Sequence, residues 1–272
     1  MIVPRPPNRP ENDSIYMIIN DNCILQDNGS AVLPELRAAQ IEPIWEQASY
    51  HARIGQYGLK VVYLVIIDEP LRFDEFEFKP LRTLLTRLSP ELFALAGRAF
   101  QVAHFIRSHN FCSRCGEALE EVTDELAVYC ASCDYRTYPR ISPCIIVAVY
   151  RYQGNDAEIL LARGARHPEG LYSVLAGFVE SGESLEQTLK REVYEEAKIT
   201  VTDIEYVKSQ PWPFPHSLMA GFIARYESGE LEVDGVELLE GDWFNFNDLP
   251  HTPPAGTIAA SLIESARQRA KA

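Results

Sequence analysis

The amino-acid sequence lacks the features that would place the chain across a membrane. Among its 272 residues, the longest apolar runs are Val61–Ile67 and Ile145–Tyr150, which are too short to span a bilayer. Residues 1–14 are polar and proline-rich and contain no apolar signal-peptide core. We therefore expect a soluble, cytoplasmic protein with no membrane partner.

Basic residues are also scarce. The chain has 25 lysines and arginines against 39 aspartates and glutamates, so its formal net charge at pH 7 is −14. Its isoelectric point is near 4.9. This balance argues against a general nucleic-acid-binding surface and against DNA as a partner. An anionic substrate would need the help of cations or of a local basic group.

Cysteines are few, and most of them stand in pairs. Of six cysteines, four form Cys112-x-x-Cys115 and Cys130-x-x-Cys133, with fourteen residues between the pairs. Two such pairs on tight turns supply four thiolates for a tetrahedral structural Zn²⁺, and Gly116 suits the first turn. An iron–sulfur site or a redox dithiol is the alternative. The two other cysteines, expected to be ordinary buried thiols, are Cys23 and Cys144.

The segment that carries the cysteine pairs is not basic. Its arginines, Arg114, Arg136 and Arg140, are outnumbered by acidic residues at 117, 120, 121, 124 and 125. We therefore expect it to be a structural or dimerisation module and not a reader of nucleic-acid sequence.

Composition and periodicity divide the chain into four predicted parts. These are a flexible arm at 1–13, an N-terminal mixed α+β domain at 14–108, the cysteine-rich module at 109–137 and an α/β domain at 138–272. In the N-terminal domain, β-branched and aromatic residues predict mainly strands, and Ser89-Pro90-Glu91 begins a helix that continues through Ile106. The predicted strands of this domain are Ile15–Ile19, Gly58–Asp68 and Phe73–Phe78.

The C-terminal domain alternates strand and helix patterns. Ile145–Tyr150 and Glu158–Ala162 predict a hairpin around Gly154-Asn155. Thr257 can cap a final helix that runs to about Arg269. The other predicted strands are Leu171–Phe178, Thr200–Val207, Leu218–Tyr226 and Trp243–Phe246.

The most informative stretch of the chain is Gly177–Ile199. Its second half predicts an amphipathic helix, because Ser184 can cap the N-terminus and apolar residues recur every fourth position at Leu185, Leu189 and Val193. We expect this helix to bury that apolar stripe and to present its other faces to solvent or to a ligand.

Carboxylates gather on another face of the same predicted helix. Glu192 and Glu196 are four residues apart, with Glu195 beside them. Their mutual repulsion would be relieved by a divalent cation, and Mg²⁺ or Mn²⁺ bridging a substrate's phosphates is the usual arrangement. Arg191 can pair with Glu183 or Glu195 and hold a carboxylate in position. On spacing alone, a solvated acidic face is the alternative.

The full pattern resembles the Nudix box of the Nudix hydrolases. It consists of Gly177, five residues, Glu183, seven residues and then Arg191-Glu192-Val193-Tyr194-Glu195-Glu196. One position departs, because the family has glycine where this chain has Lys198. A glycine there would suit a left-handed helix C-cap, so Lys198 costs about 1 kcal/mol, but it removes no proposed metal ligand.

A proline-rich segment, Ser209–Leu218, follows the box. Its three prolines alternate with two aromatic residues, which predicts a stiff, extended segment that can present flat faces to a planar ring. Gln210 and Ser217 would supply hydrogen bonds. On composition alone, a loop packed on the core is the alternative. The sequence Ser-Gln-Pro-Trp-Pro-Phe-Pro-x-Ser resembles the hallmark of the NADH pyrophosphatase (NudC-type) subfamily, and so do the cysteine pairs and Glu-Leu-Leu-Glu at 237–240.

The resemblance covers residues 92–264 and implies a fold and an assembly. It implies an α/β class protein, a Nudix α/β/α sandwich preceded by a zinc ribbon and an N-terminal mixed α+β domain, assembled as a homodimer. It also implies that the backbone carbonyl of Ala176 and four carboxylates hold catalytic Mg²⁺ or Mn²⁺, while Glu183 and Arg191 complete the catalytic set. The four implied carboxylate ligands are Glu192, Glu195, Glu196 and Glu237.

Substrate contacts are implied as well. Phe178 and Tyr138 match aromatics that sandwich a base, with Tyr138 coming from the other subunit. His216 matches a variable position of the subfamily, so we expect it to be an exposed loop residue. The complete implied substrate-binding set is Arg82, Glu125, Tyr138, Phe178, Gln210, Pro211, Trp212, Pro213, Phe214, Pro215, His216, Ser217 and Ala259.

These residues suggest a reaction. Metal ions can neutralise a pyrophosphate and lower the pKa of a bound water, and a glutamate, by hypothesis Glu195, can accept the proton of that water. The leading hypothesis is a diphosphatase that converts NAD(H) to NMN(H) and AMP, and that also removes NAD caps from RNA 5′ ends.

Two alternatives remain open at this point. The first is a Nudix hydrolase acting on ADP-ribose or dinucleoside polyphosphates, against which the proline-rich segment argues. The second is a non-catalytic nucleotide sensor or a ribbon-based nucleic-acid binder. The complete glutamate set and the acidic ribbon argue against that second reading.

Overall fold

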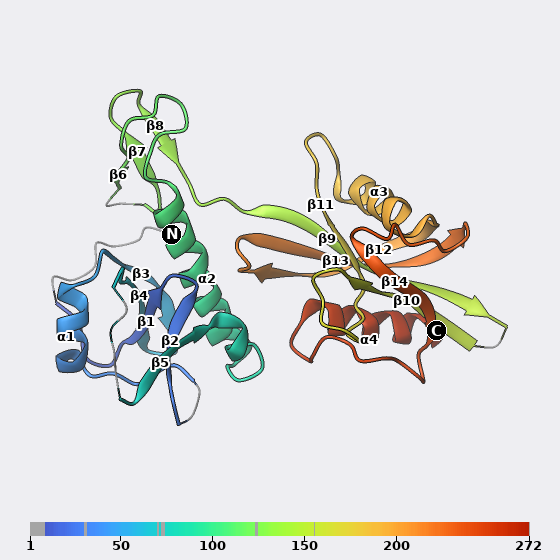
Figure 1. Ribbon diagram of the computed structural model, residues 1–272, viewed down its shortest axis with the longest axis horizontal. Coiled ribbons are helices and arrows are strands. Elements are labelled where there is room, and N and C mark those ends of the chain that lie inside the picture. The colour runs from blue at the N-terminus through green and yellow to red at the C-terminus, as the bar shows by residue number, and fades with distance from the viewer. Residues whose placement is uncertain are drawn as a thin grey trace. The chain divides into compact units, whose positions relative to one another are not determined.

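The computed structural model describes residues 9–29, 32–69, 71, 74–122, 125–154 and 156–271. The chain forms two compact units (Figure 1). The first comprises Met1–Arg140 with the loop Pro213–His216, and the second comprises Ile141–Trp212 with Ser217–Ala272. Most of the predicted flexible arm lies outside the described residues, and the boundaries placed at 108 and 137 stay predictions. Within the described ranges, no helix is long and apolar enough to cross a membrane.

The first unit is built on a five-stranded sheet in the order β3-β4-β1-β2-β5. β1 pairs with β4 in parallel, and the other neighbours are antiparallel. Helix α2 (Pro90–Ser108) packs on one face of the sheet, and helix α1 (Ala38–Glu46) packs on the other. The strands are β1 (Ile15–Asn20), β2 (Cys23–Asp27), β3 (Tyr50–Tyr57), β4 (Lys60–Ile66) and β5 (Phe76–Pro80), and a 3₁₀ turn, η1 (Leu81–Leu84), follows β5.

The N-terminal predictions were partly right. The start of α2 is confirmed, because the Ser89 hydroxyl accepts a hydrogen bond from the Leu92 N–H at 3.2 Å. The sequence predicted mainly strands up to Pro80 and did not identify helix α1. This helix has only nine residues and contains Pro43, so its pattern is too short and too irregular to signal a helix. β5 begins at Phe76, and the predicted strand start, Phe73, lies outside the described residues.

The cysteine-rich module contains a small antiparallel sheet in the order β6-β7-β8. Its strands are β6 (Glu120–Glu121), β7 (Val128–Cys130) and β8 (Tyr135–Thr137). Residue 124, one of the acidic positions noted above, lies outside the described residues.

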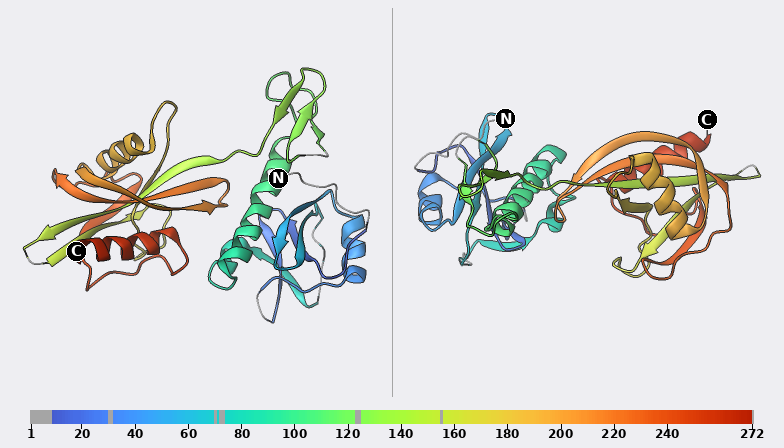
Figure 2. Two further views of the ribbon diagram at one scale, coloured as in Figure 1. Left: turned by 180° about the vertical axis from the view of Figure 1, so that it is seen from behind. Right: turned by 90° about the horizontal axis from the view of Figure 1, so that it is seen from above.

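The second unit is an α/β/α sandwich, which confirms the expected fold class. Its sheet has the order β12-β13-β9-β10-β14, and β11 also pairs with β9. β13 runs parallel to β9. Helices α3 (Leu185–Ala197) and α4 (Ile258–Lys271) cover opposite faces of the sheet (Figure 2). The strands are β9 (Ser142–Gln153), β10 (Asp156–Gly164), β11 (Leu175–Phe178), β12 (Thr200–Trp212), β13 (Ser217–Ser228) and β14 (Leu238–Asn245).

The alternation of side chains along β9 explains the three layers. Successive residues of a strand point to opposite faces. Ile145, Val147 and Val149 share a core with α3, while the intervening residues share a core with α4. The predicted hairpin is confirmed, since Gln153 pairs with Asp156. Asn155 of the predicted turn lies outside the described residues.

The proline-rich segment was predicted to be extended throughout, but in the structure two strands and a loop share it. β12 continues to Trp212 and β13 begins at Ser217, so that Pro211 pairs with Leu218 and Trp212 with Ser217. Only the loop Pro213–His216 lies outside these strands. Trp212 packs in the core that includes α4, so the core-packed alternative holds for this residue.

Candidate active site

The four paired cysteines form one cluster. Among the residues that the structure describes, they are the one set of three or more His, Cys, Asp or Glu side chains whose ligand atoms all lie within 4.8 Å of one another. The Sγ atoms of Cys112 and Cys133 are 3.6 Å apart, and those of Cys115 and Cys130 are 3.4 Å apart. Zinc–sulfur bonds of about 2.3 Å in a tetrahedron place sulfurs about 3.8 Å apart. The cluster therefore fits Zn²⁺.

Two tight turns bring the sulfurs together. The Gly116 N–H donates to the Cys112 carbonyl at 2.9 Å, and Gly116 has a φ of +82°. In the second turn Asp134 takes the corresponding left-handed conformation, with a φ of +50°. The Arg114 N–H points at Cys112 Sγ and is the leading cause that lowers the pKa of this thiol to about 6. Such a thiol is ready to bind metal as the thiolate.

Helix α3 begins and ends as the sequence predicts. The Ser184 hydroxyl accepts from the Gln187 N–H at 3.3 Å, and the Gln187 side chain accepts from the Ser184 N–H at 2.8 Å. These reciprocal bonds form a capping box. At the other end, Lys198 has a φ of +57°, which confirms that a non-glycine residue occupies the left-handed cap. Its N–H donates to the Tyr194 carbonyl at 3.0 Å.

Gly177 places one glutamate of α3 against the backbone of β11. A Cβ atom at Gly177 would lie 1.9 Å from the carboxyl carbon of Glu192, so the Glu192 side chain would have to move away. The glycine of the box is therefore required for a close approach of Glu192 to the strand. The close approach also brings the Glu192 carboxylate beside the peptide bond between Ala176 and Gly177.

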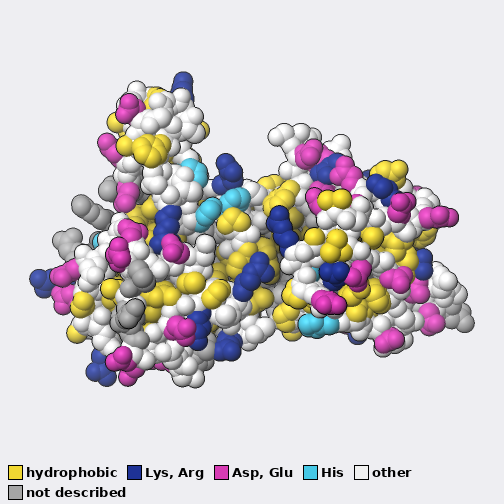
Figure 3. Space-filling model, viewed as in Figure 1, with side chains coloured by type: hydrophobic (Ala, Val, Ile, Leu, Met, Phe, Trp, Pro, Cys, Tyr) yellow, Lys and Arg dark blue, Asp and Glu magenta, His cyan; other side chains and the backbone are white. Residues whose placement is uncertain are grey.

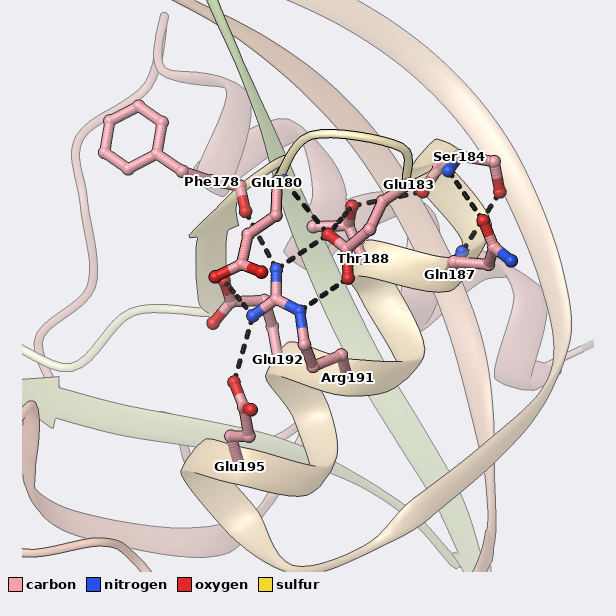
Figure 4. A network of polar contacts seen from close by, with 9 residues as sticks. All are labelled: Phe178, Glu180, Glu183, Ser184, Gln187, Thr188, Arg191, Glu192 and Glu195. Atoms are coloured by element: carbon pink, nitrogen blue, oxygen red, sulfur yellow. Dashed lines mark hydrogen bonds and ion pairs between the residues drawn. The ribbon is translucent and has the colours of Figure 1, made fainter.

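Arg191 holds the loop and helix of the box together (Figure 4). Its Nε and Nη2 donate to the two oxygens of Glu183 at 2.7 and 2.9 Å. Its Nη1 donates to Glu192 and Glu195, both at 2.9 Å, and Nη2 also donates to the Phe178 carbonyl at 3.0 Å. All five guanidinium N–H groups thus have an acceptor. The sequence predicted a pairing with Glu183 or Glu195, and the structure contains both.

Glu183 has a positioning role in this network. The Arg191 guanidinium, the Glu180 N–H at 3.0 Å and the Thr188 hydroxyl at 2.8 Å all donate to its carboxylate. These donors, Arg191 first, hold the pKa of Glu183 at about 2. The carboxylate is therefore ionised and committed to protein partners, and it fixes the guanidinium that orients Glu192 and Glu195.

Glu196 stands apart because its carboxylate has no partner. Its side chain is buried, with 6% exposure, and its Oε2 atom is buried without a hydrogen-bond partner. Burial, together with the negative charges around it, raises the pKa of Glu196 to about 8. Burial also raises the pKa of Glu192. The acids whose charges act on Glu196 are Glu192, Glu237, Asp234 and Glu195.

This arrangement fits a divalent cation. A buried carboxylate oxygen without a donor, surrounded by further acids, costs free energy unless a proton or a cation supplies the missing charge. Oxygen ligands are the ones that Mg²⁺ and Mn²⁺ prefer. The candidate ligands are the Ala176 carbonyl and the carboxylates of Glu192, Glu195, Glu196 and Glu237.

Glu237 reaches this group from a separate loop. Its N–H donates to both carboxylate oxygens of Asp234, at 3.2 and 2.9 Å, and its carbonyl accepts from the Ala165 N–H at 2.9 Å. Asp234 and the buried thiol of Cys144 were not predicted as neighbours of the site. In the sequence, Asp234-Gly235 signals only a turn. Burial, followed by the charges of Glu192 and Glu196, raises the pKa of Cys144 to about 12.

The implied substrate residues fall into small groups. Phe178 is exposed, with 56% of its surface accessible, and Figure 4 shows its ring pointing away from the Arg191 network. In the ribbon, the Tyr138 hydroxyl lies 3.3 Å from both oxygens of Glu125. Arg82 lies over the Phe214 ring, 4.2 Å from its centroid. The structure therefore brings together Glu125 with Tyr138, and Arg82 with Phe214.

Gln210 and Ala259 meet at the start of α4. The Gln210 amide donates to the Gly256 carbonyl at 2.9 Å and accepts from the Ile258 N–H at 2.7 Å, while Ala259 is buried in the next position. The Gln210 side chain thus already has two backbone partners. The Thr257 cap of α4 is confirmed, since its hydroxyl accepts from the Ala260 N–H at 3.2 Å.

Two expectations about exposure were wrong. His216 is half-buried instead of exposed, because its ring lies 5.6 Å from that of His104 in the first unit. Cys23 is only partly buried, whereas Cys144 is buried as expected. Ser217 and Pro213 are buried, and Pro211 and Pro215 are exposed.

Comparison with known proteins agrees with this architecture. Three family models match successive parts of the chain: the NADH pyrophosphatase-like rudimentary NUDIX domain at 13–104, the NADH pyrophosphatase zinc ribbon domain at 107–138 and the NUDIX domain at 143–265. The NAD-capped RNA hydrolase NudC of Erwinia tasmaniensis is 49% identical over 213 residues, which cover 78% of each chain. The protein of the same name from Salmonella heidelberg is 46% identical over 232 residues, or 85% of each chain.

The chain belongs to the NADH pyrophosphatase subfamily of the Nudix family. The rudimentary NUDIX match explains why the first unit also has helices on both faces of a mixed sheet, although it carries no Nudix box. Both the zinc ribbon and the Nudix domain expected from the sequence are therefore confirmed.

Proposed function

We propose that this Nudix protein hydrolyses the pyrophosphate bond of NAD(H) in the cytoplasm, giving NMN(H) and AMP, and that it removes NAD caps from RNA 5′ ends. The observation that carries the proposal is the Glu196 carboxylate, which is buried among other acids without a hydrogen-bond partner. The same Nudix box also contains the exposed ring of Phe178. Relatives 46–49% identical are named NAD-capped RNA hydrolases, which supports it. Four zinc-binding thiolates also suit a reducing compartment.

The protein's own groups have distinct roles in this proposal. Bound at the Ala176 carbonyl and the carboxylates of Glu192, Glu195, Glu196 and Glu237, Mg²⁺ or Mn²⁺ would neutralise pyrophosphate oxygens and lower the pKa of a water. Glu192 is held in place by Gly177 and Arg191, and Glu196 is held by burial. Both are suited to act as fixed ligands.

Glu195 is the best candidate for the general base. Its side chain is 57% exposed, so it can reach a water in the open part of the site, which the buried Glu196 cannot do as readily. Arg191 donates to one of its oxygens at 2.9 Å. This single contact orients the carboxylate and leaves its other oxygen for a proton.

The aromatic and polar residues outside the box bind the two halves of the dinucleotide in this proposal. Phe178 offers an exposed face to a base, and Tyr138, 53% exposed, offers another. The pairs Glu125–Tyr138 and Arg82–Phe214 would contribute hydrogen bonds and stacking. Pro211, Pro213, Pro215, Trp212, His216, Ser217 and Ala259 would shape the pocket around them.

Replacing Phe178 by alanine tests the dinucleotide assignment. Stacking a base on an aromatic ring contributes about 1–3 kcal/mol, so kcat/KM on NADH and on NAD-capped RNA should fall roughly 5- to 150-fold. ADP-ribose, which has one base, should lose much less. Tyr206→Ala is a matched control, because Tyr206 is also 56% exposed but lies on β12. Equal losses on all three substrates would mean that Phe178 does not select for a second base.

A homodimer is part of the proposal. Three aromatic side chains of the ribbon region, Phe111, Tyr135 and Tyr138, are 70%, 38% and 53% exposed, and exposed aromatic residues are enriched at protein–protein interfaces. Analytical ultracentrifugation should give a dimer for the wild type and more monomer for Phe111→Ser. A monomeric wild type at micromolar concentration would contradict this part, and with it the supply of Tyr138 by a second subunit.

A further inference from the structure

The first unit contains a basic cavity outside the Nudix site. It has a volume of about 270 Å³ and is lined by His104, Ser108 and His109 of α2, by Arg140, and by His216 of the loop Pro213–His216. Three imidazoles and one guanidinium face it, and none of its described lining residues is acidic. Such a grouping is notable in a chain with a net charge of −14.

The basic groups in this cavity lie close to one another. The rings of His104 and His216 have centroids 5.6 Å apart. Burial, followed by the charges of His216, His109 and Arg140, lowers the pKa of His104. His109 is oriented by its own helix, since its Nδ1 atom lies 3.1 Å from the Phe105 carbonyl oxygen. An anion placed among these groups would favour their charged forms.

A larger cavity of about 670 Å³ adjoins the first and shares His104 and Ser108 with it. Arg82 and Arg107 line it, together with the aromatic rings of Phe100 and Phe214. The Arg107 guanidinium donates to two backbone carbonyls, those of Asp21 at 2.7 Å and Ile67 at 3.1 Å, which orient it without cancelling its charge. Figure 3 shows histidine side chains beside α2, with basic side chains next to them.

One loop of the implied substrate-binding set lines both cavities. Pro213, Phe214 and Pro215 line the larger cavity, and the next residue, His216, lines the smaller one. Phe214 and Pro215 belong to the proposed dinucleotide contacts. Aromatic rings, arginines and histidines thus line two adjoining cavities, which is the combination that binds single strands.

We propose that the cavity formed by His104, His109, Arg140 and His216 binds backbone phosphates of single-stranded RNA directly behind its NAD cap. The inference rests on the proposed function, because it assigns to capped RNA contacts with His104, His109 and Arg140 that free NADH does not make. Imidazolium and guanidinium groups donate hydrogen bonds to phosphate oxygens, and arginine does so in a bidentate way. The cavity thus favours capped RNA over the free dinucleotide.

The test compares two variants that change this cavity and none of the proposed catalytic or dinucleotide contacts. Arg140→Gln and His104→Gln are assayed on NADH and on a short NAD-capped oligoribonucleotide at 50 and 200 mM salt. For Arg140→Gln, KM on the capped RNA should rise about tenfold, the lower end for a hydrogen bond to a charged group. The slope of log KM against log salt should also fall by about 0.7, as for one lost phosphate contact. Activity on NADH should stay unchanged.

Arg114→Gln is the matched control, because it removes the same charge from an exposed ribbon position that does not line the cavity. Melting temperatures establish that all three variants fold. An equal loss in Arg114→Gln, equal losses on NADH and capped RNA, or no loss on capped RNA would each overturn the proposal. In the last case the wild type still cleaves both substrates, so the proposed function survives. A wild type that cleaves NADH but not capped RNA would overturn this inference and the RNA part of the proposed function.

Discussion

Replacing Glu196 by glutamine should change how the stability of the metal-free protein depends on pH. The pKa of Glu196 is raised from an ordinary 4.5 to about 8, so between these values the folded state binds a proton that the unfolded state has released. Stability falls with rising pH wherever the folded state binds more protons. The contribution is fully present below pH 4.5 and is lost as the pH rises through 8. Each pH unit within this window costs up to about 1.4 kcal/mol.

Between pH 5.5 and 7.5, the wild type should therefore lose up to about 2.7 kcal/mol more stability than Glu196→Gln does. Urea unfolding at both pH values, without divalent cations, measures this difference. The chain has three tryptophans. In a Trp45→Phe background, only Trp212 and Trp243 report, and both lie in the second unit.

Saturating Mg²⁺ or Mn²⁺ should remove the pH-dependent difference, because a bound cation replaces the proton on the carboxylate. Identical pH slopes for the wild type and Glu196→Gln in the absence of cations would refute the reasoning. They would mean that the Glu196 carboxyl is not buried without a partner, and the fit to a divalent cation would then lose its main support.

Three further changes probe other parts of the account. Cys112→Ser should lower the zinc content and the melting temperature together; a folded, zinc-loaded variant without activity would contradict a structural role. Gly177→Ala places a Cβ 1.9 Å from the Glu192 carboxyl carbon, so kcat should fall about 100-fold or more. The zinc content should stay intact. Normal turnover would refute the need for this close approach. Lys198→Gly should stabilise the protein by about 1 kcal/mol in urea unfolding, since Lys198 has a φ of +57°. A less stable variant would show that the contacts of the Lys198 side chain outweigh this strain.

The Nudix box could be predicted from the sequence because its interactions are local. Ser184, Gln187, Arg191 and Glu195 all contact residues within a few turns of the same helix or its preceding loop. The left-handed conformation at Lys198 followed from the glycine that the family has there. The cysteine cluster was equally predictable, because the spacing of each pair determines its turn.

Contacts between distant segments could not be predicted in this way. The Gln210 amide is 48 residues from its partner Ile258, and nothing in the proline-rich segment indicates that this amide ends up at the start of α4. Asp234 enters the acidic site through its bonds to the backbone of Glu237, which the sequence shows only as a turn. The half-burial of His216 likewise depends on His104, over 100 positions away.

The central claim is that this protein cleaves the pyrophosphate of NAD(H) with a divalent cation held by the Nudix glutamates. The most direct measurement is product analysis by chromatography with NADH, with and without Mg²⁺ or Mn²⁺, for the wild type and Glu196→Gln. We predict equal amounts of NMNH and AMP from the wild type only when the cation is present, and far slower turnover by a still-folded Glu196→Gln. Hydrolysis without a divalent cation, unchanged turnover in Glu196→Gln, or release of nicotinamide in place of NMNH would contradict the claim.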